Sequence, residues 1–368
     1  MNSFARKKRV LSGIQPSGTL HIGNFIGAIS MWVEQQDTYE NLFCVADLHA
    51  LTMPEAIAPA RLRELARETA ALYVACGVDP EKSAVFPQSD VPEHTYLAWV
   101  LLCCTPVGWL EGMNQYKTKA ALSESIGSGL LTYPALQAAD ILIYKADYVP
   151  VGDDQKQHIE LARDVAQRFN RLYAEGFFPL PKVLTRSSGA RIMALDDPSI
   201  KMSKSLEGMR RDHAVTLLDS PDTIRKTIMS AVTDSGSDIR FEHASAGVRN
   251  LLTLYEVLSA EPRNSIEERF AGTGYGWLKR DLVSLIVEKL EPVQKRYRQI
   301  TADQGYLDHL LAEGAGKAGA IAGKTLEAVK QLTGLGPTHT RYTSPTEARD
   351  QGLAIGSPTP TRQVGGGP

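Results

Sequence analysis

The first half of the chain alternates short apolar segments with longer helical ones, and this alternation restricts the fold more than any other feature. Short strands of the buried type are predicted at residues 9–14, 42–46, 83–86 and 148–151. The helices predicted between and after them are residues 22–36, 60–76 and 154–169. Strands joined by helices of this length imply parallel crossovers. The sequence therefore predicts an α/β fold built on a doubly wound, Rossmann-like parallel sheet.

The pattern changes after about residue 208, where strand-like segments become rare. Ser220 and Pro221 have the order typical of a helix N-cap and first helical position. Further helices are predicted at 247–260, 276–300 and 306–333. We expect a sheet domain at 1–208, a helical domain at 209–300 and a terminal helix at 301–336 that packs back on the sheet domain. The tail at 337–368 has few large apolar residues and is expected to be disordered.

The composition is that of an ordinary globular protein and disfavours several classes of protein. The formal net charge is −2, with 22% charged residues, so any nucleic-acid contact must come from local patches. The four cysteines have no C-x-x-C spacing, which disfavours a metal or iron–sulfur site and favours reduced thiols. No apolar run approaches the roughly 18 residues of a membrane span, and the basic start leads into no signal-type segment. We expect a soluble cytoplasmic protein that has no membrane contact.

Two stretches combine residue types suited to phosphate binding. In SGIQPSGTLHIGNFIGA (12–28), a strand enters a glycine-rich turn and then a helix, whose first N–H groups can bind an anion. His21 can donate to phosphate oxygens there, although a plain strand–helix connection with a buried histidine is the simpler interpretation. In KMSKS (201–205), two lysines flank a Met-Ser pair, and alone such lysines are usually just solvated. Together the stretches favour phosphoryl or nucleotidyl transfer, which is catalysed largely by positioning and charge stabilisation.

These stretches resemble the two signatures of class I aminoacyl-tRNA synthetases. HIGN (21–24), here the first signature, is similar to the HIGH motif, and KMSKS, here the second signature, matches the other motif. From about Arg9 to Leu335 the chain resembles the bacterial tryptophanyl family of that class, most specifically in SGIQPSG, FCVADLHALT, GLLTYPALQAADILIY and VPVGDDQKQHIELARDVAQRFN. The resemblance implies a ligase that uses ATP to activate L-tryptophan as tryptophanyl-adenylate, releases pyrophosphate and transfers tryptophan to tRNA(Trp).

The resemblance also implies an ATP site. The residues expected to act on the phosphates are His21, Asn24, Lys119, Lys201 and Lys204. Further ATP contacts are expected from Gln15, Ser17, Gly23, Gly152, Asp153, Asp154, Met202, Ser203 and Ser205. Mg²⁺ would be held mainly by the ATP phosphates, with no protein side chain as a metal ligand. Asp153 stands where glutamate is more usual in the family.

The tryptophan pocket is expected around Asp140. An indole N–H can only donate, so a side chain that selects it must accept, and the family's aspartate at this place does so. The alternative is a paired aspartate on a helix surface. The other residues that the resemblance places in the pocket are Leu11, Gln15, His49, Tyr133, Gln137, Val149, Val151 and Gln155. Gln137 replaces a methionine that is common in the family, which leaves the shape of the pocket open.

The remaining expectations concern partners. The helical domain would bind the anticodon end of the tRNA, with phosphate contacts from Lys279, Arg280, Lys289, Lys295, Arg296 and Arg298, although most of these are surface cations on the simpler interpretation. The apolar segment 94–117 resembles the family's dimer region, and a homodimer is expected. The alternatives are a tyrosine-specific enzyme, a nucleotidyltransferase that does not use tRNA, and a non-catalytic relative.

Overall fold

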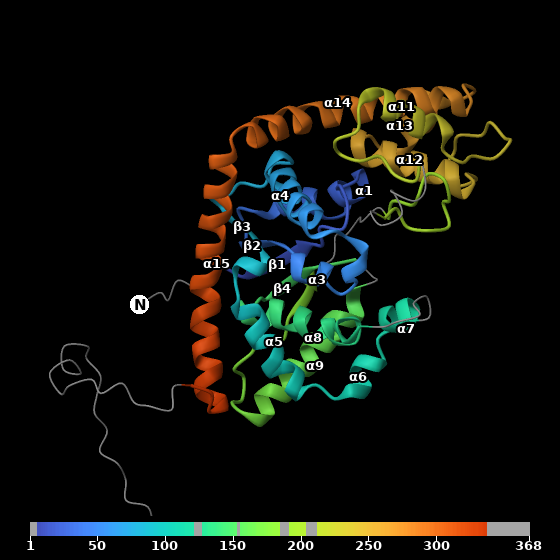
Figure 1. The fold of residues 1–368 in the computed structure, drawn as a ribbon. Coiled ribbons are helices and arrows are strands. Elements are labelled where there is room, and N and C mark those ends of the chain that lie inside the picture. Colours follow the sequence, from blue (N-terminus) through green and yellow to red (C-terminus); the bar gives the residue numbers. More distant parts are fainter. Residues whose placement is uncertain (1–5, 121–126, 153–154, 185–190, 204–211, 337–368) are drawn as a thin grey trace, which may run out of the picture.

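A five-stranded parallel sheet forms the centre of the described part of the chain (Figure 1). The structure is a computed structural model that describes residues 6–120, 127–152, 155–184, 191–203 and 212–336. The strands are β1 (Arg9–Ile14), β2 (Glu40–Val45), β3 (Ser83–Pro87), β4 (Tyr148–Pro150) and β5 (Lys182–Leu184). The predicted α/β fold with a doubly wound parallel sheet is confirmed, and β5 is a strand that the sequence analysis missed. The tail predicted to be disordered lies outside the described residues.

The strand order is β3-β2-β1-β4-β5, so the winding of the chain reverses between β1 and β4. β1 pairs with β2 from Arg9 opposite Glu40 to Ile14 opposite Val45. In open sheets of this kind, ligands bind outside the carboxyl ends of the strands at the reversal point. The topology therefore favours a site beyond Ile14, at the end of β1.

Helices make up most of the remaining chain. Those in the first half are α1 (Ile22–Asn24), the π-helical segment η1 (Phe25–Ile29), α2 (Ser30–Gln35), α3 (Asp47–Ala50), the 3-10 turn η2 (Pro54–Ala56), α4 (Pro59–Ala75), the 3-10 turn η3 (Gln88–Asp90), α5 (Glu93–Cys104), α6 (Val107–Glu111), α7 (Asn114–Ala120), α8 (Ser128–Ile143) and α9 (Lys156–Leu172). Those in the second half are α11 (Pro221–Ser230), α12 (Ala246–Ser259), α13 (Arg263–Phe270), α14 (Tyr275–Ala302) and α15 (Gln304–Thr333). None of the helices in the described ranges is both long enough and apolar enough to cross a membrane.

The predicted start of α11 is confirmed in atomic detail. The Ser220 hydroxyl accepts the Thr223 N–H at 3.2 Å, and Pro221 takes the first helical position. By contrast, the single helix predicted at 22–36 is interrupted by the π-helical segment η1, which follows directly on the first signature.

Side chains alternate between the two faces of the sheet and build two apolar cores. On β2, Phe43 and Val45 enter one core, whereas Leu42 and Cys44 enter the other. The first core includes residues of α4 and of the later helices α11, α12 and α14, and the second includes residues of α5, α8 and α9. Because helices cover both faces, Leu42–Val45 of β2 form a continuous apolar run rather than an alternating one.

The long helix α15 covers β3, the strand at one end of the sheet order (Figure 1). An uncovered edge strand would offer unpaired backbone groups to other chains. The contact is close, because a Cβ atom added at Gly314 would stand 1.9 Å from the Val85 carbonyl oxygen. A glycine at this place on α15 therefore permits the helix to lie directly on the strand backbone.

One predicted tRNA contact is wrong. Lys279 is only 8% exposed, and its ammonium group donates to the carbonyl oxygens of Met229 and Ala231, at 3.1 and 2.7 Å. It therefore binds the carbonyl groups at the end of α11, which a helix leaves without partners, and cannot reach a tRNA phosphate. The other five predicted cations, Arg280, Lys289, Lys295, Arg296 and Arg298, are exposed.

The Gly314 contact gives a prediction about stability. Gly314→Ala should lower the free energy of unfolding by about 3 kcal/mol, because the added methyl group forces α15 away from β3. Gly316→Ala is the matched control: nothing lies within 4 Å of its added Cβ atom, so this change should stabilise α15 by about 0.8 kcal/mol. Urea unfolding of the two variants measures both effects, and equal stability of the two would contradict the close packing.

Candidate active site

Polar side chains from the carboxyl ends of three neighbouring strands meet beside β1. Gln15 follows β1, His49 lies on α3 after β2, and Gln88 begins η3 after β3. The Gln15 amide donates to the His49 carbonyl oxygen at 3.0 Å, which joins the ends of the first two strands. The fold thus brings together Gln15 and His49, two of the predicted pocket residues.

The Asp140 carboxylate lies at the centre of this group. Its Oδ2 atom accepts from His49 Nε2 at 2.7 Å, and its Oδ1 atom accepts from the Gln88 amide and from His94 Nδ1, each also at 2.7 Å. Asp140 is 8% exposed, so it is a buried residue of α8 and not an aspartate on a helix surface. The surface alternative for Asp140 is therefore excluded.

A second layer of hydrogen bonds fixes the proton positions around Asp140. An ionised carboxylate can only accept, so His94 Nδ1 carries the proton that it shares with Asp140. In the neutral ring, His94 Nε2 then accepts from the Tyr144 hydroxyl, which lies 2.7 Å away. His94 and Tyr144 are both fully buried, so this chain is shielded from water.

These contacts decide the charge of Asp140. Burial alone would raise the pKa of its carboxyl group, because a low dielectric disfavours the charged form. The attraction and hydrogen bond of His49, together with the hydrogen bond of His94, outweigh burial and hold the pKa of Asp140 below its ordinary value. Burial also raises the pKa of Tyr144, with the charge of Asp140 adding to the effect, so this residue remains a donor.

Tyr133 extends the same site along α8. Its hydroxyl lies 2.8 Å from His158 Nε2, and its ring meets that of His49 edge-on with centroids 6.2 Å apart. Burial raises the pKa of Tyr133 to about 12, so the hydroxyl stays protonated. Gln137 is half-buried and lies three residues before Asp140, on the same side of the helix.

The first signature begins the helical segment that follows β1. The Nδ1 atom of His21 accepts the Asn24 N–H at 3.3 Å, while the Asn24 side-chain oxygen accepts the His21 N–H at 3.1 Å. This reciprocal capping box leaves the proton of a neutral His21 ring on Nε2, from which it can be donated. Gly23 leaves little room for a side chain, because an added Cβ atom would stand 3.0 Å from His21 Nδ1.

The second signature lies against the first. Met202 is 2% exposed, and its sulfur would be 3.6 Å from a Cβ atom at Gly23, so it packs over the start of α1. Lys201 next to it is exposed and pairs with Met193 in an antiparallel bridge. The fold therefore brings together two signatures that are about 180 residues apart in the sequence.

For the other predicted residues, the structure gives the burial, a backbone contact or the element on which the residue lies. Leu11 and Val149 are buried in the second core, and Val151 packs against it. Ser17 is half-buried in the turn after β1, and Gly152 precedes Gln155, whose backbone N–H donates to the Gly152 carbonyl oxygen at 3.0 Å. Lys119 lies on α7. Asp153, Asp154, Lys204 and Ser205 lie outside the described residues.

Sequence analysis missed four residues of the site: Gln88, His94, Tyr144 and His158. Gln88 lies two residues after a predicted strand, so the search of strand ends that drew attention to Gln15 would have found it. His94 and His158 lie on helices and Tyr144 directly follows one, and a buried histidine or tyrosine carries no sequence signal that distinguishes it from a core residue.

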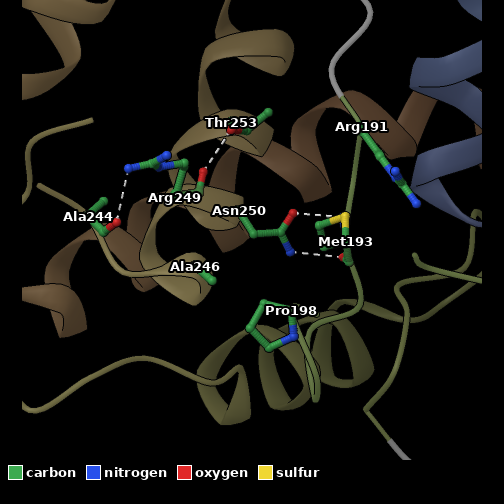
Figure 2. Close-up of a pocket in the computed structure, with 8 residues that line it drawn as sticks. All are labelled: Arg191, Met193, Pro198, Ala244, Ala246, Arg249, Asn250 and Thr253. Atoms are coloured by element: carbon green, nitrogen blue, oxygen red, sulfur yellow. Dashed lines mark hydrogen bonds between the residues drawn. The ribbon is translucent and has the colours of Figure 1, made fainter. Parts of the chain in front are cut away.

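A cavity of about 440 Å³ lies elsewhere, between the segment 191–198 and α12 (Figure 2). Its lining includes Arg191, Arg249 and Asn250, and no residue predicted to bind ATP or tryptophan. Asn250 binds the backbone of Met193 on both sides, accepting from its N–H and donating to its carbonyl oxygen, each at 2.9 Å (Figure 2). This pair attaches α12 to the segment that leads into the second signature.

Comparison with known proteins agrees with the fold and with the two signatures. A family model described as tRNA synthetases class I (W and Y) matches residues 3–290. The chain belongs to this family of class I tRNA synthetases.

Within the family, several relatives at 47–50% identity are tryptophan–tRNA ligases. The chain is 48% identical over 332 residues to a tryptophan–tRNA ligase of Gloeobacter violaceus, a match that covers 90% of this chain and 97% of that protein. The structure of tryptophanyl-tRNA synthetase from Mycoplasma pneumoniae superposes with a TM-score of 0.81 at 36% identity, covering 90% of this chain and 98% of that one. The Campylobacter jejuni tryptophanyl-tRNA synthetase, solved with ADP and tryptophan, gives 0.77 at 34% identity, with 89% and 100% covered.

The cluster around Asp140 leads to a prediction about His94. His94→Phe should lower the free energy of unfolding by about 3 kcal/mol, because it removes a donor from a buried carboxylate and the acceptor of a buried hydroxyl. His309→Phe is the control: its side chain is 80% exposed, and the change should stay within about 0.5 kcal/mol. Urea unfolding measures both, and a His94→Phe protein as stable as the control would contradict the hydrogen bonds assigned to His94.

Proposed function

We propose that the chain is a tryptophan–tRNA ligase that works in two steps. L-tryptophan reacts with ATP to form tryptophanyl-adenylate and pyrophosphate, and tryptophan then passes to tRNA(Trp). The observation that carries the proposal is a buried, ionised Asp140 next to two packed class I signatures, in a chain similar over 90% of its length to tryptophan enzymes.

Asp140 selects the indole ring through its one remaining acceptor position. A carboxylate has about four lone-pair sites, two on each oxygen. Among the described side chains, Gln88 and His94 donate to Oδ1 and His49 donates to Oδ2, which leaves a site on Oδ2 for the indole N–H. A substrate that lacks this N–H leaves a buried charge short of a donor, and the site therefore discriminates against it.

The remaining pocket residues come from three parts of the fold. Gln15 and Leu11 come from β1 and the turn after it, Tyr133 and Gln137 from α8, and Val149, Val151 and Gln155 from β4 and the turn that follows. Tyr133 and Gln155 bind the amino group of tryptophan, and the two valines contact the ring. Gln137 lines the pocket in place of the family's methionine.

ATP binds at the packed signatures. His21 donates from Nε2 to a phosphate oxygen, and Asn24 keeps His21 in place through the capping box. Gly23, with no side chain, lets the nucleotide approach the helix start, and Met202 packs the second signature beside it. Mg²⁺ is bound mainly by ATP phosphate oxygens, as this hard cation prefers. Lys119, Lys201 and Lys204 balance the charge that moves onto pyrophosphate.

The nucleic-acid partner binds across the second half of the chain. The exposed cations of α14 contact phosphates near the anticodon end of tRNA(Trp), so residues 209–300 act as the anticodon-binding part. Residues 1–208 catalyse, and the helix at 301–336 supports them from the edge of the sheet. The protein acts in the cytoplasm, where tRNA is charged for protein synthesis.

Two copies of the chain form the active assembly. The surface around α5 and α6 exposes large apolar side chains, with Trp99 66% and Val107 60% exposed. Both lie in the segment 94–117 that resembles a dimer region. A monomer would leave this surface in water, so we assign it to the partner copy.

The first functional prediction concerns amino-acid choice. The purified protein should exchange pyrophosphate with ATP in the presence of tryptophan and magnesium, and tyrosine should not support the exchange. Asp140→Asn should raise the KM for tryptophan about 30-fold, the loss expected for a hydrogen bond to a charged group, while the KM for ATP stays within about twofold.

Asp164→Asn, an exposed aspartate of α9, is the control and should behave as the unaltered protein. Exchange supported by tyrosine alone would overturn the assignment to tryptophan. An unchanged tryptophan KM in the Asp140 variant would remove Asp140 from substrate selection.

The second functional prediction concerns assembly. The protein should sediment as a dimer of 40.2 kDa chains, and Trp99→Glu should shift it towards the monomer because a charge enters the apolar interface. Trp277→Glu changes an equally large side chain that is 50% exposed on α14, and it should leave the dimer intact. Analytical ultracentrifugation distinguishes the cases, and a dimer that survives Trp99→Glu would place the interface elsewhere.

A further inference from the structure

A short segment at 213–217 connects the two signatures through backbone hydrogen bonds. On one side, the Ile22 N–H donates to the Val215 carbonyl oxygen at 2.9 Å, and the Leu217 N–H donates to the Leu20 carbonyl oxygen at 2.8 Å. On the other side, the Leu195 N–H donates to the His213 carbonyl oxygen at 3.0 Å. The segment therefore touches both the start of α1 and the stretch that leads into the second signature.

His213, at the start of this segment, is fully buried and uses both ring nitrogens. Its Nε2 atom accepts the backbone N–H of Ser203 at 3.3 Å, and its Nδ1 atom lies 2.7 Å from Asp196 Oδ1. Because Nε2 accepts, the proton of the ring is on Nδ1 and is donated to Asp196. Ser203 belongs to the second signature, so the ring binds that signature directly.

The geometry points to His213 as a positioning residue that fixes the backbone of the second signature at Ser203 against the first signature. This inference rests on the proposed function, in that the two signatures together bind ATP. The contacts form a series from Asp196 to the first signature. Asp196 orients the His213 ring, the ring accepts the Ser203 N–H, and the neighbouring Met202 packs at Gly23.

A buried histidine could instead be simple core filling, but its hydrogen bonds oppose that interpretation. A polar ring in a fully buried place costs free energy unless its nitrogens are bonded, and here both are. In addition, Asn250 holds the same stretch independently through both backbone groups of Met193 (Figure 2). The stretch therefore stays attached to α12 when His213 is changed, and variants at 213 should fold.

Two substitutions separate the two ring contacts. The amide nitrogen of His213→Asn takes the place of Nδ1 and keeps the bond to Asp196, but the variant has no acceptor for the Ser203 N–H. The amide oxygen of His213→Gln reaches the place of Nε2 and restores that acceptor. The measurements are pyrophosphate exchange with tryptophan, thermal unfolding, and hydrogen exchange of the Ser203 amide.

His213→Asn should raise the KM for ATP about tenfold, the equivalent of one hydrogen bond. The KM for tryptophan should stay near that of the unaltered protein, the melting temperature should fall no further than in His213→Gln, and exchange of the Ser203 amide should become at least tenfold faster. His213→Gln should restore most of the ATP effect and most of the amide protection.

Other outcomes overturn the inference. An unchanged ATP KM and unchanged amide protection in His213→Asn would show that the ring does not position Ser203. Equal losses of ATP and tryptophan affinity in both variants, with a lowered melting temperature, would show a merely structural residue. Failure of the unaltered protein to exchange pyrophosphate would count against the proposed function instead, and the amide measurement would still decide the role of His213.

Discussion

The buried charge of Asp140 is the interaction on which the rest of the site depends. A carboxylate inside a protein is stable only when donors surround it. Here Gln88, His49 and His94 supply them, and the first two stand at the ends of β3 and β2. The parallel sheet is what makes this possible, because it brings the carboxyl ends of neighbouring strands to one edge.

The same edge organises the ATP half of the site. The first signature follows the turn after β1, and the segment at 213–217 pairs with its start through Val215 and Leu217. The second signature meets the first through Met202 and is bound to the same segment through His213. Hydrogen bonds thus hold both signatures against the same segment, although the signatures are about 180 residues apart in the sequence.

Much of this arrangement was predictable because it rests on local patterns. Apolar periodicity predicts the strands, and residue chemistry predicts the Ser220 cap and the two stretches suited to phosphate binding. The role of Asp140 follows from the family resemblance. What could not be predicted depends on partners distant in the sequence. Nothing near Lys279 indicates that it binds the end of α11, and nothing near His94 or His213 indicates which carboxylate it meets. The short strand β5 and the π-helical segment η1 were missed for a similar reason, since tertiary packing rather than local propensity defines them.

The central claim is that Asp140 identifies the substrate by accepting the indole N–H. The most direct measurement is competition between tryptophan and its benzothienyl analogue, in which sulfur replaces that N–H at nearly constant shape. The account predicts that the protein binds tryptophan about 30-fold or more tightly than the analogue, and that Asp140→Asn removes most of this preference. Equal affinities for the two ligands, or a preference that survives unchanged in Asp140→Asn, would contradict it.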